Sequence, residues 1–196
     1  RTDGNDDQQL GLDLVYGQKK LRAEVMAIAG NYQVSPDEYR ERGYSATASY
    51  AVEKNLEIGV SSLVTHAELD VALLDSRLRQ AHGVFARYSP VERIGVFAEA
   101  NVLADSVGDA DLAVGSVGYL QVDTEPVQGL HVRGGGEWCD DNHGDDATAV
   151  LRATGSVIWF FLPHLNVRGD VFYGTLYCTP GTEPGPLALV QLQGYL

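Results

Sequence analysis

The chain has 196 residues, a formal net charge of −13, 22 glycines and 10 tyrosines. Its 14 basic residues are scattered, so the clustered Lys and Arg that nucleic-acid binding requires are missing and we expect no nucleic-acid partner. No apolar run reaches the roughly 20 residues that a membrane-spanning helix needs. This exclusion does not extend to membrane-crossing strands, which carry apolar residues only at every second position.

Alternation of apolar and polar residues runs along the whole chain and predicts a single all-β domain over residues 1–196, built as an antiparallel meander of hairpins. Most alternating segments are long enough for a tilted strand to cross a bilayer. The eleven predicted strands cover residues 9–17, 20–32, 43–53, 56–67, 81–89, 93–105, 111–123, 128–139, 147–161, 165–178 and 186–196.

The two faces of these strands differ in composition. In the first strand Leu10, Leu12 and Leu14 share one face, whereas Asp13 lies on the other. The apolar rows contain no charge and are rich in Ala, Gly and Val, which suits contact with lipid better than the filling of a soluble core. The opposite face carries the residues predicted to line a lumen: Arg22, Glu24, Glu57, Arg87, Glu99, Arg133, Glu137, Arg152, Arg168 and Asp170.

The connections between the predicted strands alternate in length, which is typical of outer-membrane barrels with their long loops outside. The short connections are residues 17–19, 53–55, 89–92, 123–126 and 162–164. The long connections are residues 34–43, 66–80, 139–146 and 179–186, and residues 105–111 are intermediate. Residues 67–80 are compatible with a short helix over the barrel or with a hairpin extended above the membrane.

Aromatic residues gather at strand ends on the apolar face. Odd-numbered strands run towards the periplasm in this arrangement, so their final aromatics are expected at the inner membrane–water interface and those of even strands at the outer one. The predicted aromatic girdle consists of Tyr16, Tyr50, Tyr88, Trp138, Trp159, Tyr173 and Tyr177.

The chain resembles the bacterial outer-membrane β-barrel class over nearly its whole length, down to the final strand-like segment Val190–Leu196. That class usually ends on an aromatic residue, whereas this chain ends on Leu196 after Tyr195. The resemblance implies a Gram-negative outer membrane, a porin-like barrel with extracellular long loops, a periplasmic C-terminus, and contact with lipid and lipopolysaccharide.

The strand count is odd, whereas single-chain bacterial barrels have even numbers. The alternation of loops also places Arg1–Asp7 outside the membrane. We therefore expect a transmembrane up-and-down barrel of about twelve strands, whose first strand precedes Arg1.

Cys139 and Cys178 are the last residues of two predicted strands that end on the outer side, and the oxidising periplasm would allow a disulfide between them. The acidic segment Asp140–Asp146 lacks the ligand spacing of an EF-hand. We interpret it as a solvated loop, bridged to lipopolysaccharide by divalent ions, and expect no dedicated metal site.

No catalytic motif is present, so we predict neither an enzyme nor a cofactor. Charges of both signs favour a narrow or occluded lumen, and the acidic loops suit contacts with other envelope proteins. The leading hypothesis is an integral scaffold of an envelope or cell-surface machine for motility, adhesion or secretion. The alternatives are a porin-like channel for small solutes and a soluble lipocalin-like binding barrel.

Overall fold

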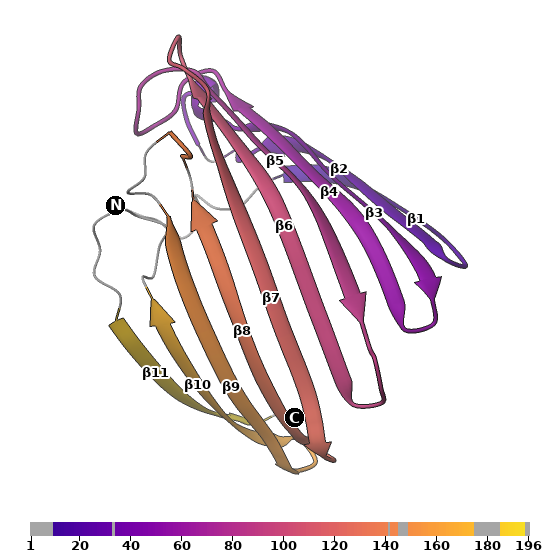
Figure 1. The fold of residues 1–196 in the computed structure, drawn as a ribbon. Coiled ribbons are helices and arrows are strands. Elements are labelled where there is room, and N and C mark those ends of the chain that lie inside the picture. Colours follow the sequence, from indigo (N-terminus) through magenta and orange to yellow (C-terminus); the bar gives the residue numbers. More distant parts are fainter. Residues whose placement is uncertain (1–9, 33, 141, 145–148, 175–184, 195–196) are drawn as a thin grey trace.

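The computed structural model describes residues 10–32, 34–140, 142–144, 149–174 and 185–194. These residues form one antiparallel sheet of eleven strands in chain order, with a short 3-10 helix, η1, at Asp37–Tyr39 (Figure 1). The strands are β1 (Leu10–Gln18), β2 (Leu21–Gly30), β3 (Arg42–Glu53), β4 (Leu56–Ala67), β5 (Arg77–Tyr88), β6 (Ile94–Val107), β7 (Ala113–Val127), β8 (Leu130–Asp140), β9 (Val150–Leu162), β10 (Leu165–Gly174) and β11 (Gly185–Gly194). The predicted all-β meander is therefore confirmed.

β5 begins at Arg77 rather than at the predicted residue 81. Its first residue pairs with Ala67, the last residue of β4, so the hairpin is continuous up to the loop at 68–76. Of the two structures considered for residues 67–80, the extended hairpin is the correct one.

The register joins the apolar rows of neighbouring strands into one continuous face. Leu14 pairs with Val25, which pairs with Ala46, which pairs with Ser62. Because side chains alternate along each strand, residues next to these in sequence lie on the opposite face. The separation of an apolar face from a charged face thus holds over most of the sheet. The exceptions are Gln80 and His82 of β5 on the apolar face and Leu187 and Leu189 of β11 on the charged face.

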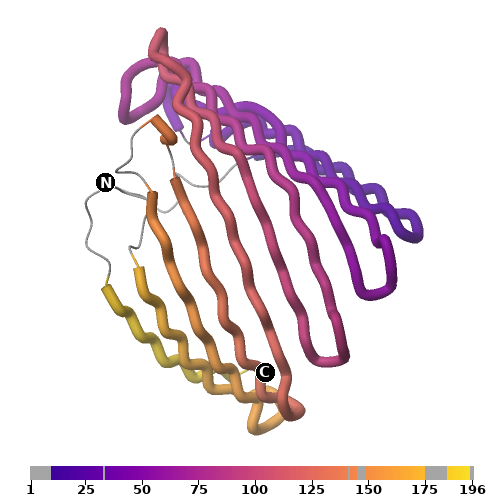
Figure 2. Tube along the Cα trace, in the orientation of Figure 1, coloured from indigo at the N-terminus to yellow at the C-terminus, as the bar shows by residue number. Residues whose placement is uncertain are grey.

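The short connections lie at one end of the strands, and the longer connections after β4 and β6 lie at the other end, as expected (Figure 2). The predicted turn at residues 123–126 is wrong, because β7 continues through an irregularity in the pairing to Val127. The chain turns instead at residues 128–129, where Gly129 has a φ of 80°. A glycine tolerates this left-handed conformation without a steric penalty.

The sheet is curved but open, so the expected closed barrel is not what the described residues form. β1 and β11 lie at opposite edges, and no pairing joins these two strands in the described part of the chain (Figure 1). In a meander of eleven antiparallel strands the first and the last run in the same direction. Their direct pairing would have to be parallel, whereas the even-numbered bacterial barrels close with antiparallel pairs only.

The apolar face is not covered by a second layer. Its side chains remain exposed, up to 73% for Leu151 and 77% for Val190, and the only buried apolar residues among those described are Ile28, Ala67 and Cys139. The accessible surface is 13175 Å², compared with about 9,000 Å² for a compact monomer of this length. The sheet therefore has a large apolar surface that needs an apolar neighbour.

Candidate functional site

The residues predicted to line a lumen all lie on the face of the sheet opposite the apolar rows. The register shows this directly for Glu57 opposite Arg87 and for Glu137 opposite Arg152. We call this surface the charged face. It has three parts: a set of tight ion pairs, a hollow with loose ion pairs, and a cluster at the loop end.

Tight ion pairs cover the charged face of β7–β10. Arg133 on β8 donates to Asp123 on β7, and Arg152 on β9 donates to Glu137 on β8. On β10 the Nε of Arg168 donates to Asp170 at 2.8 Å. Charge-assisted hydrogen bonds of this kind fix both partners, so these arginines are engaged within the wall of the sheet.

The pairs on the other half of the charged face are loose. Arg22 Nη2 lies 3.6 Å from Glu24, and Arg87 Nη1 lies 3.6 Å from Glu57. The side chains of Arg22 and Arg87 are 69% and 60% exposed. These distances exceed hydrogen-bond range, so both guanidinium groups keep donors directed to solvent.

A hollow of about 310 Å³ lies among these loose pairs and brings together half of the predicted lumen residues. We call it the inner hollow. Its lining residues are Arg22, Glu24, Thr47, Ser49, Glu57, Ser61, Phe85, Arg87, Phe97 and Glu99. The predicted residues Arg133, Glu137, Arg152, Arg168 and Asp170 lie apart from it, on β8–β10.

Aromatic residues of the charged face did not feature in the sequence prediction. The rings of Phe85 and Phe97 are 6.5 Å apart, and Phe97 is 5.9 Å from Tyr119. The guanidinium of Arg87 stands 5.4 Å from the Phe85 centroid and 5.9 Å from that of Phe97. Their position could have been predicted from the sequence, since Phe85 and Phe97 alternate with the apolar residues of their strands just as the charged residues do.

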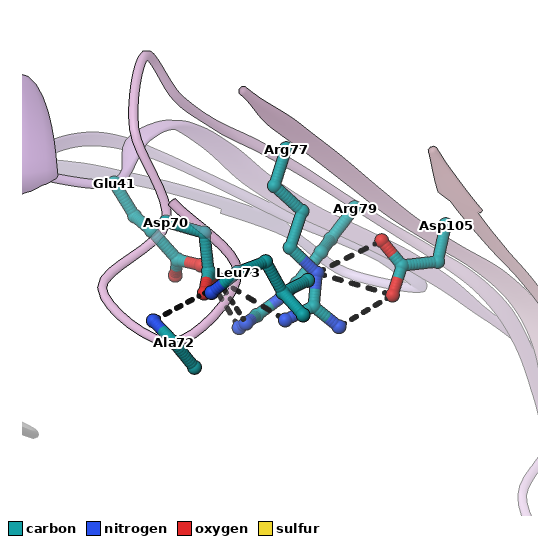
Figure 3. A network of polar contacts seen from close by, with 7 residues as sticks. All are labelled: Glu41, Asp70, Ala72, Leu73, Arg77, Arg79 and Asp105. Carbon is teal, nitrogen blue, oxygen red and sulfur yellow. Dashed lines mark hydrogen bonds and ion pairs between the residues drawn. The ribbon is translucent and has the colours of Figure 1, made fainter. Parts of the chain in front are cut away.

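The third part of the charged face is an ionic cluster at the loop end, shown in Figure 3. Arg77 lies between two carboxylates: its Nε donates to Asp105 at 3.0 Å and its Nη1 donates to Asp70 at 3.1 Å. Arg79 joins Asp70 at 3.2 Å to Glu41 at 2.8 Å. We call these five residues the loop-end cluster.

The loop-end cluster was not predicted, because residues 66–80 and 105–111 were expected to be connections. The alternation of Arg77 and Arg79 at the start of β5 is the signal that could have revealed it. A hollow of about 610 Å³, lined in part by Arg40, Asp70 and Arg79, adjoins the cluster.

The loop-end cluster holds the connections in place. Asp70 is buried and accepts the backbone N–H groups of Ala72 and Leu73 at 2.8 and 3.1 Å. Leu69 donates to the Glu38 carbonyl at 3.0 Å, which joins the β4–β5 loop to the β2–β3 loop. The β6–β7 loop joins them through Gly108, whose N–H donates to Ser76 at 2.8 Å.

Apolar side chains protrude from the loop that the cluster holds. Val71, Leu73 and Leu74 are 67%, 49% and 68% exposed, and we call them the loop tip. Leu74 has a φ of 55°, a left-handed conformation that costs a non-glycine residue about 1 kcal/mol. The loop therefore presents apolar groups to solvent in a conformation that local preference does not favour.

Electrostatics at the loop end favour ionised carboxylates. Desolvation would raise the pKa of Asp70, but the hydrogen bonds from Ala72, Arg77 and Leu73 outweigh it and leave this pKa below its ordinary value. A hydrogen bond from Arg42 likewise lowers the pKa of Asp37. The acidic members of these pairs are thus charged at neutral pH.

The predicted aromatic girdle lies on the apolar face wherever the structure describes it. Tyr16, Tyr50, Tyr88 and Trp159 lie near the short turns. Trp138 and Tyr173 lie near the opposite ends of their strands. The six side chains are between 42% and 57% exposed. Tyr177 lies outside the described residues.

Only one of the two cysteines of the predicted disulfide lies among the described residues. Cys139 is buried near the end of β8, at the loop edge, whereas Cys178 lies outside the described residues. The cross-link therefore stays a prediction.

The acidic segment 140–146 is also only partly described, because Asp141, Asp145 and Asp146 lie outside the described residues. His143 Nδ1 lies 2.7 Å from Asp140. Within the described part of the chain no three His, Cys, Asp or Glu side chains come together as a metal site.

Comparison with known proteins gives no family. No protein-family model matches the sequence, and no curated protein matches it either. In the described segments no helix has the length and hydropathy to span a membrane.

Proposed function

We propose that the chain forms the wall of a β-barrel in a bacterial outer membrane, with the apolar face towards lipid and the charged face towards a lumen. The proposal is supported by the uncovered apolar face, whose charged residues Arg42 and Asp140 lie only at strand ends, and by the aromatic residues near both ends of the strands. In this arrangement the long connections are extracellular and the C-terminus is periplasmic.

We further propose that the closed barrel has twelve strands. β1 and β11 run in the same direction at the two edges of the sheet. One additional strand, antiparallel to both, would satisfy the unpaired backbone groups of both edges at once. A strand preceding Arg1 would supply it, and the even count agrees with bacterial barrels in general.

Within this barrel we propose a scaffold role, in which the extracellular loops anchor another envelope or cell-surface protein. The observation that carries this proposal is the loop-end cluster, which ties the loops together beneath the exposed loop tip. Ordered loops lose little conformational entropy on binding, and the burial of exposed apolar groups is a main driving force of protein association. Lipopolysaccharide is the expected neighbour around this platform.

A co-purification experiment tests the scaffold role. The chain would be isolated from its native envelope in mild detergent, with Val71, Leu73 and Leu74 all changed to Ser in one variant. The matched control is Val91→Ser. Val91 is 57% exposed and lies in the short β5–β6 turn, at the opposite end of the strands from the loop tip. We expect envelope proteins to accompany the parent and the control but not the triple variant. Isolation of the parent as a lone barrel would contradict the proposal.

A porin-like channel is the second candidate, and the exposed guanidinium groups of Arg22 and Arg87 favour it. Charged side chains that line a pore set its ion selectivity. Reversal of charge in Arg87→Glu should then shift the selectivity of planar-bilayer conductance towards cations. Absence of measurable conductance in the parent would exclude this candidate.

A further inference from the structure

The inner hollow has an aromatic floor that the backbone of β4 makes room for. A Cβ atom at Gly59 would lie 2.3 Å from Cζ of Phe85, so the Phe85 ring occupies the space above this glycine. Phe97 extends the floor onto β6 at 6.5 Å, and Arg87 is stacked near both rings. The floor is therefore built from packed groups on adjacent strands.

The rim of the inner hollow is polar and carries both signs of charge. Arg22 with Glu24 and Arg87 with Glu57 form its two loose pairs, each at 3.6 Å. Thr47, Ser49 and Ser61 add hydroxyl groups, and Glu99 accepts a hydrogen bond from Asn101 at 2.9 Å. The inner hollow thus combines charged and hydroxyl groups at its rim with the aromatic rings of its floor.

The loose pairs restrict the chemistry of a ligand. A hydroxyl group can donate to a carboxylate and accept from a guanidinium at the same time, so it can bridge a pair that is too far apart to hydrogen-bond directly. It also leaves the charge of the pair balanced. A charged or zwitterionic solute would instead compete with one member of each pair for its partner, whereas an uncharged solute leaves both pairs in place.

We propose that the inner hollow binds a small, uncharged, polyhydroxylated solute, a mono- or disaccharide. The apolar face of the sugar ring would lie against Phe97 and the part of Phe85 that Gly59 and the Arg87 guanidinium leave uncovered, and its hydroxyl groups would bridge the Arg–Glu pairs. The volume of about 310 Å³ is at the lower end of the range of ligand sites. This inference goes beyond the scaffold role and does not require a partner at the loops.

Isothermal titration of the purified chain in detergent tests the proposal, with D-glucose and maltose as probes and L-leucine as a zwitterionic comparison. We expect the sugars to bind with millimolar affinity. Phe85→Ala should weaken binding by about tenfold, because it removes the stacking surface. Arg87→Lys should weaken it as well, because an ammonium group cannot stay stacked as a planar guanidinium does.

The matched control is Phe172→Ala, which removes a ring from the charged face on β10, away from the inner hollow. Phe85→Tyr keeps the ring and should keep the affinity, which separates loss of stacking from loss of folding. Three results would each overturn the proposal: no sugar binding, sugar binding that Phe85→Ala leaves unchanged, or tighter binding of leucine than of glucose. Loss of binding with retained co-purification would leave the scaffold role intact.

Discussion

The two halves of the charged face use the same residue types in different ways. On β7–β10 the arginines form hydrogen-bonded pairs, and Arg152 is only 15% exposed. Around the inner hollow Arg22 and Arg87 are 69% and 60% exposed, and their carboxylate partners lie beyond hydrogen-bond range. Tight pairs hold neighbouring strands together, whereas loose pairs leave donors and acceptors available to another molecule.

This difference does not follow from the register alone, because tight and loose pairs both occur between directly opposite residues. Arg133 and Asp123 lie directly opposite one another on adjacent strands, as do Arg152 and Glu137. At the inner hollow Glu57 also lies opposite Arg87, but the guanidinium is drawn towards the rings of Phe85 and Phe97. The aromatic neighbours therefore turn a cross-strand pair into a loose one.

The largest expected effect is at the loop end, where the tight arrangement is most extensive. Arg77→Ala leaves Asp70 and Asp105 without their shared partner in a poorly solvated site and should destabilise the fold by about 3 kcal/mol. Urea unfolding in detergent micelles measures this. Limited proteolysis should show new cleavage in residues 68–76, and an unchanged cleavage pattern would show that the cluster does not hold the loop.

Arg152→Ala tests the tight half of the sheet itself. It leaves Glu137 without its charge-assisted hydrogen bond and should cost about 2 kcal/mol in the free energy of unfolding. The comparison variant is Arg87→Ala, measured under the same conditions. Equal losses in the two variants would erase the distinction between tight and loose pairs.

Acid should release the loops before it unfolds the sheet. The folded-state pKa of Asp70 is lowered, so its stabilising contribution is fully present above the ordinary value of 3.8 and is lost as pH falls below that value. The effect should be smaller than that of Arg77→Ala, because a protonated carboxyl group still accepts hydrogen bonds from the backbone. Hydrogen exchange of the 68–76 amides as a function of pH measures it, and protection that persists unchanged to pH values well below 3.8 would contradict it.

The smallest effect on stability is expected at the inner hollow. Arg87→Ala removes a pair that is mostly solvent-exposed and should cost less than about 1 kcal/mol. Its effect should appear in sugar titration rather than in unfolding. A loss of stability as large as that of Arg152→Ala would mean that Arg87 has a structural role.

The faces of the sheet could be predicted from sequence because their signal is local. Alternation along one strand decides on which side Arg22 or Trp159 lies, and the register preserves that choice across the sheet. Strand ends were harder to predict. Arg77 and Arg79 continue the alternation of β5, but they stand beside the apolar residues of a loop and were grouped with it.

The partners of charged residues could not be predicted in the same way. Whether Arg77 meets Asp70 or Asp105 depends on the path of a loop and on the register of two hairpins. Whether the sheet closes could also not be predicted from the alternation along single strands. Closure depends on the pairing of β1 and β11 with strands that are distant in sequence.

Quenching of tryptophan fluorescence by brominated lipids tests the central claim most directly. Trp138 and Trp159 are the chain's two tryptophans. Both lie on the apolar face, Trp138 at the loop end of β8 and Trp159 at the short-turn end of β9. After reconstitution into vesicles, we expect strong quenching of both by lipids brominated near the headgroup and weak quenching by aqueous acrylamide. Single-tryptophan variants, each with the other changed to Phe, would separate the two signals. Strong acrylamide quenching without lipid quenching would contradict the assignment of the apolar face to the membrane.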